Sequence, residues 1–271
     1  MSRFKIRERL INRFVGCPDT LSEVSETMIE ESSMQLSDWR PLNESIFHTS
    51  FWMLKPDVLK ALETGDWSTC ATELAPDIVR IELFEPSVLS VLESELRGLE
   101  QWAAENRVDV SPPNSMHHYG IETHPLGLNR VLDDVVARVA DPLAKAFFPE
   151  VVDSGLTSQH SFFVTYGQSH NHSLGFHADD SEVTFNFCLG GDFIGSDLYF
   201  QGRRCFGHMQ TPHHPDEHFE IEQIPGTCIV HAGLHRHGVL PILQGQRRSL
   251  IVWTRSASFR QREGRNICTD W

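Results

Sequence analysis

The sequence predicts an α+β, mainly β protein in which helices come first and a sandwich or barrel of short strands follows. Helical periodicity dominates the first half of the 271-residue chain, and after about residue 158 the apolar residues alternate instead. Regularly spaced strands without intervening helices are typical of sandwiches and barrels, with any helices packed outside. The length is sufficient for one large domain, or for a core domain with a helical extension.

Two amphipathic helices are predicted before the strands begin. The first starts at Pro86, whose missing N–H costs nothing in a first helical turn, and its apolar residues recur at steps of three and four. The second covers residues 128–147, and the loop 111–116, rich in Pro and Asn, separates the two. The basic segment 3–14 is interpreted as a surface helix.

Six strands are predicted in the second half of the chain. They are residues 162–166, 182–189, 197–201, 219–223, 227–231 and 247–254. The segment 182–189, EVTFNFCL, alternates most clearly, with Val183 and Phe185 on the apolar side and Thr184 and Asn186 on the other. One face of this strand therefore packs in an apolar layer, and the other carries polar groups.

Net charge and cysteine usage narrow the class of protein. A formal charge of -14 repels phosphate backbones, which argues against a nucleic-acid partner. The six cysteines form no C-x-x-C pair, and we interpret them as reduced thiols of a cytosolic protein. Since no apolar run approaches the roughly 18 residues of a membrane helix, we expect a cytoplasmic protein without a membrane segment.

A candidate iron site begins with the tripeptide His177-Ala178-Asp179 and includes a histidine several strands later. Two imidazoles and one carboxylate on one face of a ferrous ion leave room for a bidentate co-substrate and O2. The tripeptide alone is weak, because 15 histidines produce about one H-x-D by chance. A second copy, His214-Pro215-Asp216, lies in a stretch rich in His and Pro, and we interpret it as a solvated loop.

Three histidines compete for the distal position: His231, His235 and His237. Their spacing to Arg247 and the glycine that follows favour His237. An arginine ten residues beyond the distal histidine can reach the far carboxylate of 2-oxoglutarate as a bidentate partner. Ser249 lies on the same strand face as Arg247, so its hydroxyl can bond the same carboxylate.

Taken together, these segments resemble a known family. The H-x-D with EVTFNFCLGGDFIGSDLYF, and the later GTCIVHAGLHRHGVLPILQGQRRSLIVWTRS, are similar to the prolyl/lysyl-hydroxylase-like branch of the 2-oxoglutarate/Fe(II) dioxygenases. The similarity starts upstream at PNSMHHYG and covers roughly residues 110–260.

The resemblance implies a double-stranded β-helix (jelly-roll) core and names the site residues. It implies His177, Asp179 and His237 as ligands of Fe(II), Arg247 as the 2-oxoglutarate anchor, and ascorbate as a typical reductant. Tyr166 matches an aromatic residue of the family pattern, and Tyr166 and Asn186 are expected to hydrogen-bond the co-substrate. The alternatives are that Tyr166 only packs at a strand end and that Asn186 bonds the backbone.

We therefore expect an N-terminal, mostly helical extension (1–105), a dioxygenase domain (106–260) and a C-terminal tail (261–271). The expected reaction hydroxylates a second substrate, a protein lysyl or prolyl side chain or a small metabolite, and releases succinate and CO2. One alternative is a non-catalytic, cupin-like jelly-roll protein that binds a metal or ligand. Another is a zinc module formed by Cys205 and His208 with His213, His214 or His218, although these lack the usual paired spacing. The loops 112–119 and 203–218 are predicted to rim the entrance.

Overall fold

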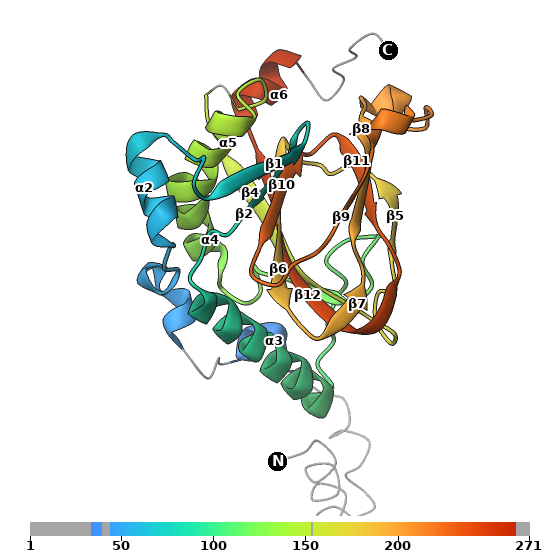
Figure 1. Ribbon diagram of the computed structural model, residues 1–271. Coiled ribbons are helices and arrows are strands. Elements are labelled where there is room, and N and C mark those ends of the chain that lie inside the picture. The colour runs from blue at the N-terminus through green and yellow to red at the C-terminus, as the bar shows by residue number, and fades with distance from the viewer. Residues whose placement is uncertain (1–33, 40–43, 153, 264–271) are drawn as a thin grey trace, which may run out of the picture.

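The computed structural model describes residues 34–39, 44–152 and 154–263. The surface helix expected at 3–14 lies outside this part of the chain. Two antiparallel sheets face each other, and the helices gather outside the larger sheet (Figure 1). The predicted fold class, a double-stranded β-helix core with helices packed outside, is confirmed.

The larger sheet has eight strands within the described residues, in the order β1-β2-β10-β6-β12-β4-β3, with β7 paired to β12. The smaller sheet has four, in the order β5-β11-β8-β9. The strands are β1 (Ala71–Ala75), β2 (Ile78–Ile81), β3 (Gly120–Glu122), β4 (Ser158–Gly167), β5 (Leu174–His177), β6 (Val183–Gly190), β7 (Phe193–Gly195), β8 (Leu198–Arg203), β9 (His218–Ile221), β10 (Cys228–Ala232), β11 (His235–Val239) and β12 (Ile242–Arg255).

The α-helices are α2 (Pro56–Thr64), α3 (Pro86–Asn106), α4 (Asn129–Val135), α5 (Asp141–Phe147) and α6 (Ala257–Glu263). Short 3-10 helices are η2 (Leu36–Asp38), η3 (Glu44–Phe47), η4 (Thr49–Phe51), η6 (Phe206–His208) and η7 (Pro215–Glu217). The predicted helices at 86 and at 128–147 therefore both form.

The second of these helices contains a π-helical segment, η5 (Val136–Ala140), between α4 and α5. Pro142 follows directly and is the second residue of α5. A proline has no N–H to donate, and its ring clashes with the carbonyl four residues earlier. The wider π turn accommodates this proline without ending the helix, which the apolar periodicity alone does not predict.

The two faces of the larger sheet have different surroundings. Outward-facing apolar side chains of β6 and β12, such as Phe185 and Leu250, join one buried cluster with Leu92 of α3 and Leu132 of α4. The inner face of β6 carries Thr184, Asn186 and Cys188, all buried between the sheets. The helices thus cover the apolar face, and the polar face is directed toward the smaller sheet.

The strands β1 and β2 were not predicted. They form a hairpin whose second strand pairs with β10, so residues before 106 extend the larger sheet as well as supplying helices. The division of the chain at residues 105 and 260 stays a prediction.

Two other expectations concern thiols and membranes. Four cysteines of the described residues, Cys70, Cys188, Cys205 and Cys228, are free thiols. Among the helices of the described chain, none has the length and apolar character that crossing a membrane requires.

Candidate active site

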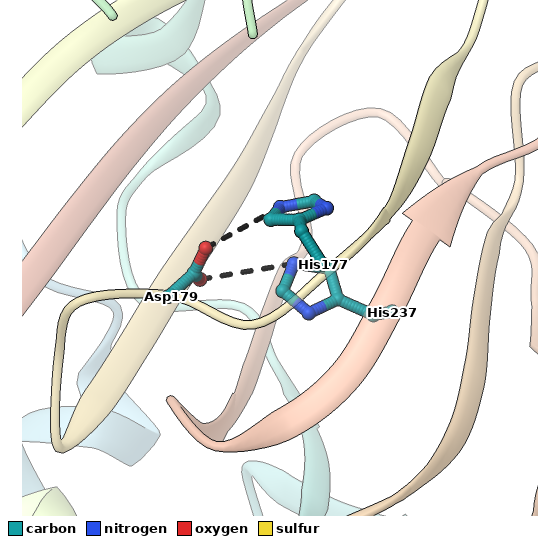
Figure 2. A group of neighbouring side chains, drawn as sticks. All are labelled: His177, Asp179 and His237. Atoms are coloured by element: carbon teal, nitrogen blue, oxygen red, sulfur yellow. Dashed lines mark ion pairs between the residues drawn. The ribbon is translucent and has the colours of Figure 1, made fainter. Parts of the chain in front are cut away.

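Three predicted ligands converge between the sheets. His177 ends β5 and lies directly opposite His237 in the antiparallel ladder with β11, and Asp179 follows in the next loop. The Asp179 carboxylate faces both imidazoles from one side, with Oδ1 3.4 Å from Nε2 of His177 and Oδ2 3.7 Å from Nε2 of His237 (Figure 2). All ligand atoms of the three residues lie within 4.8 Å of one another.

The backbone fixes which nitrogen of each imidazole faces the site. Nδ1 of His177 lies 2.8 Å from the carbonyl of Gly175, and Nδ1 of His237 lies 2.8 Å from the carbonyl of His235. A carbonyl oxygen only accepts, so each Nδ1 carries a proton, and Nε2 is the nitrogen of each ring that faces the site. Both rings therefore present a metal-binding nitrogen next to the carboxylate.

Asp179 is held in its ionised form. Its N–H donates to the carbonyl of Gly233 at 2.9 Å, and the Thr184 hydroxyl donates to Oδ2 at 2.6 Å. Burial acts to raise the pKa of Asp179, but His237 and His177 outweigh it and hold the pKa well below its usual range. Burial also lowers the pKa of His237 well below its usual value.

The loop that carries Asp179 is tied to the C-terminal helix. Asp180 pairs with Arg255 at 3.0 Å through Oδ2 and with Arg260 of α6 at 3.0 Å through Oδ1. Arg260 also donates through Nε to Glu182 at 2.7 Å. These ion pairs flank the ligand loop on its far side and limit its movement.

The donor set fits a ferrous ion. Two imidazole nitrogens and one carboxylate oxygen, with the remaining directions free of protein ligands, are typical of non-haem Fe(II) sites. In the described part of the chain, this is the one group of three or more His, Cys, Asp or Glu residues arranged to hold a metal. Cys205 and His208 approach each other at 3.1 Å, but no third residue completes a zinc group there among those residues.

The two competing distal histidines are buried nearby but stand outside the group. Nε2 of His231 is 3.9 Å from Oδ2 of Asp179 and has no hydrogen-bond partner among the described residues. His235 shares a strand with His237, and burial lowers its pKa to about 3. Both rings contact the ring of Phe200 on β8, with centroid distances of 5.2 Å for His231 and 5.0 Å for His235.

Arg247 is fully buried, with its guanidinium in the interior. It donates to the hydroxyls of Ser196 at 3.0 Å and Ser249 at 2.7 Å, and to Oε1 of Gln223 at 3.2 Å. Its Nη2 and the amide nitrogen of Gln223 have no hydrogen-bond partner among the described residues. Two buried donors on neighbouring side chains need an acceptor, and a carboxylate has the oxygens to accept from both.

Two of the other predicted residues, Tyr166 and Ser249, contact this arginine. The ring of Tyr166 lies over the Arg247 guanidinium at 4.5 Å, and Ser249 bonds that same group. Asn186 is buried on the inner face of β6, and its Oδ1 has no partner among the described residues. Their roles toward a co-substrate stay predictions.

The sequence did not single out three residues of this region, although His117 lies in the predicted entrance loop 112–119 and Gln223 ends the predicted strand 219–223. Ser196 lies between β7 and β8, Gln223 follows β9, and His117 lies in the loop before β3 with Nε2 3.1 Å from the Tyr166 hydroxyl. Loop residues follow no apolar period, so the sequence carries no signal for them beyond the segment PNSMHHYG, which contains His117.

The second H-x-D is exposed, as predicted. His214 and Asp216 lie at the surface around η7. Two arginines join the segment that contains this H-x-D to the smaller sheet through hydrogen bonds. Arg236 donates to the carbonyls of Met209 and Thr211, and Arg204 bonds Glu217.

Two antiparallel sheets around a site of two imidazoles and one carboxylate, with a buried arginine beside it, define the double-stranded β-helix of non-haem iron oxygenases. Comparisons with known proteins agree with this class. An OGFOD2-like domain matches residues 36–153. The family resemblance therefore begins well upstream of residue 110, where the sequence motifs first indicated it.

The chain is a homologue of the 2-oxoglutarate and iron-dependent oxygenase domain-containing proteins. It is 34% identical to protein CP2 of Arabidopsis thaliana, over 83% of this chain and 60% of that protein. It is 38% identical to protein ICU11 of the same plant, over 70% and 48% respectively. It is 32% identical to domain-containing protein 2 of Homo sapiens, over 68% and 50%. The chain thus spans about half to three-fifths of the length of these relatives.

Solved structures with a similar fold include prolyl hydroxylases. A Pseudomonas putida prolyl-4-hydroxylase aligns with a TM-score of 0.45 and 17% identity, over 73% of this chain and 98% of that chain. A prolyl 4-hydroxylase of Phytophthora capsici aligns with a TM-score of 0.49 and 15% identity, over 78% and 66%.

Proposed function

We propose that the protein is a dioxygenase that requires Fe(II) and 2-oxoglutarate, hydroxylates a second substrate and releases succinate and CO2. One observation carries this proposal: the metal-binding group and a fully buried arginine with an unpaired donor share the interior between the sheets. A protein that only binds a metal has no need for a buried guanidinium whose Nη2 has no partner among the described residues, because a buried donor without an acceptor is costly.

His177, Asp179 and His237 would hold the iron, and Arg247 with Gln223 would hold the far carboxylate of 2-oxoglutarate. Bound iron supplies the centre at which O2 is activated as 2-oxoglutarate is decarboxylated. The protein contributes fixed charge and orientation. Asp179 stays ionised because the imidazoles beside it lower its pKa, and Arg247 neutralises a carboxylate in a place where burial excludes water.

The second substrate we propose is a lysyl or prolyl side chain of a protein, or a small metabolite, as the resemblance of the sequence motifs to the prolyl/lysyl-hydroxylase-like branch suggests. Ascorbate is proposed as the reductant and the cytoplasm as the location. A nucleic-acid substrate is disfavoured by the net charge of -14.

The test is formation of succinate from 2-oxoglutarate with and without added Fe(II). Turnover is expected to need the metal and to be lost when His177 and Asp179 are both replaced by Ala. The matched control replaces His214 and Asp216 by Ala, which removes the same residue types at the same spacing from the exposed H-x-D. Equal loss in both double variants would contradict the assignment. Bound iron without succinate formation in any condition would favour the cupin-like binding protein.

A further inference from the structure

The loop before β3 brings one histidine into the co-substrate region. His117 is 4% exposed, and its Nε2 lies 3.1 Å from the hydroxyl oxygen of Tyr166. Its other ring nitrogen, Nδ1, lies 3.1 Å from Oδ1 of Asn114. The three side chains form a chain of hydrogen bonds that ends at the ring stacked on Arg247.

The direction of these hydrogen bonds is fixed by Asn114. Its Oδ1 accepts the backbone N–H groups of Met116 at 3.0 Å and His117 at 2.9 Å, so this atom is the oxygen of the amide and not the nitrogen. Since Oδ1 can only accept, the Nδ1 of His117 donates to it. A neutral imidazole has one N–H, so its Nε2 then carries a lone pair.

In the hydrogen bond between His117 and Tyr166, the proton lies on the Tyr166 oxygen. Burial lowers the pKa of His117 to about 4, so its ring is neutral at pH 7. Burial also raises the pKa of Tyr166 to about 12, so the phenol keeps its proton. Nε2 of His117 lies 3.1 Å away and can accept, so the Tyr166 hydroxyl donates its hydrogen bond to this nitrogen.

We propose that His117 is a positioning residue of the co-substrate site. Its Nε2 accepts the one hydrogen bond that the Tyr166 hydroxyl can donate, so Tyr166 contacts Arg247 with its ring and donates no hydrogen bond to the co-substrate. At Arg247 itself, the buried donors without a hydrogen-bond partner among the described residues are its own Nη2 and Nε2 of Gln223. This inference rests on the proposed function. Nη2 of Arg247 and Nε2 of Gln223 hold the far carboxylate of 2-oxoglutarate, and the ring of Tyr166 orients the guanidinium over which it lies.

The first experiment reads the direction of the Tyr166 hydrogen bond without any metal or co-substrate. The chain has 3 tyrosines, so replacing Tyr119 and Tyr199 by Phe leaves Tyr166 as the one reporter. The intensity ratio of the tyrosine Fermi doublet in its Raman spectrum distinguishes a donating phenol from an accepting one. A donor-type ratio is expected in this background, and a ratio typical of a phenol that only accepts overturns the proposal.

Variants of His117 in the same background identify the acceptor. His117→Phe is expected to remove the donor-type ratio, and His117→Gln, whose amide oxygen can accept, is expected to restore it. A merely structural role for His117 moves the melting temperature in both variants but leaves the Raman ratio unchanged. If His117→Phe does not fold, the parental spectrum and the His117→Gln spectrum still decide the direction.

The second experiment measures 2-oxoglutarate binding by calorimetry on the Mn(II)-loaded protein. Tyr166→Phe keeps the ring and is expected to weaken binding by less than about threefold, whereas Tyr166→Leu loses the cation–π contact and weakens it by about tenfold. A loss of about tenfold or more in Tyr166→Phe is the size expected for a lost charge-assisted hydrogen bond and overturns the proposal. Absence of 2-oxoglutarate binding by the parent would instead overturn the proposed function, while the Raman result still decides the role of His117.

Discussion

Replacing Arg247 by Lys tests the co-substrate site most directly. The guanidinium of Arg247 is 0% exposed and spans three partners, Ser196, Gln223 and Ser249, through its Nε and Nη1 atoms. Its Nη2 remains available for an incoming acceptor. A lysine keeps the positive charge, but its ammonium is a single point with no planar fork, so it cannot satisfy the three partners and a ligand together.

The expected loss of 2-oxoglutarate affinity follows from the one hydrogen-bond donor that the ligand loses. A hydrogen bond to a charged group contributes roughly 1.5–3 kcal/mol when both partners are buried. At about 1.4 kcal/mol per factor of ten, Arg247→Lys is expected to weaken 2-oxoglutarate binding by roughly 10- to 150-fold. Arg247 bonds none of the three metal ligands, so the affinity for Mn(II) should stay within about twofold of the parent.

Calorimetric titration of the Mn(II)-loaded protein with 2-oxoglutarate measures this difference. The matched control is Arg248→Lys, the same substitution at the next position of β12, where the side chain pairs with Glu93 and Glu100 of α3 instead. Arg248→Lys is expected to bind 2-oxoglutarate as the parent does. Parental affinity in Arg247→Lys would refute the reasoning, since it would mean that the unpaired donor never meets the ligand.

Three further predictions concern the surroundings of the site. Thr184→Val removes the hydroxyl that donates to the ligand carboxylate at 2.6 Å and should weaken metal binding by about 10- to 100-fold in a chelator competition, whereas Thr165→Val, which loses a bond to a carboxylate of α3, should not. Arg236→Met leaves several backbone carbonyls without their donor and should lower the free energy of unfolding in urea by about 3 kcal/mol; a change below about 0.5 kcal/mol would contradict this. The Arg204 hydrogen bond lowers the pKa of Glu217 from its ordinary 4.5 to about 2, so its contribution to stability is complete above pH 4.5 and is lost as the pH falls toward 2. The difference in unfolding free energy between the parent and Glu217→Gln should therefore shrink over that interval, and a constant difference would argue against the ion pair.

The sequence predicted the elements whose side chains alternate or repeat. Apolar and polar residues alternate in the segment 182–189 because its two faces have different surroundings. Phe185 packs under the helices, and Thr184 faces the metal-binding group. The segment 128–147 shows a continuous apolar face for the same reason. The metal-binding group was predictable because two of its members lie two residues apart in the chain and the third precedes a recognisable strand.

What the sequence could not predict depends on contacts between distant segments. The hairpin of β1 and β2 is short, and β2 is held by pairing with β10, about 150 residues later. His117, Ser196 and Gln223 reach the interior from loops whose path is set by the sheets around them. No local pattern distinguishes such a residue from an exposed one of the same type.

The ion pairs between Asp180 and the last described helix have a consequence for how the site is assembled. A chain is synthesised from its N-terminus, and Arg260 is made 81 residues after Asp179. The loop that presents the ligand carboxylate is fully braced only when β12, which carries Arg255, and α6 have both been made and have folded back onto it. Metal uptake should therefore be a late event of biogenesis, which follows completion of the whole β-helix instead of guiding it.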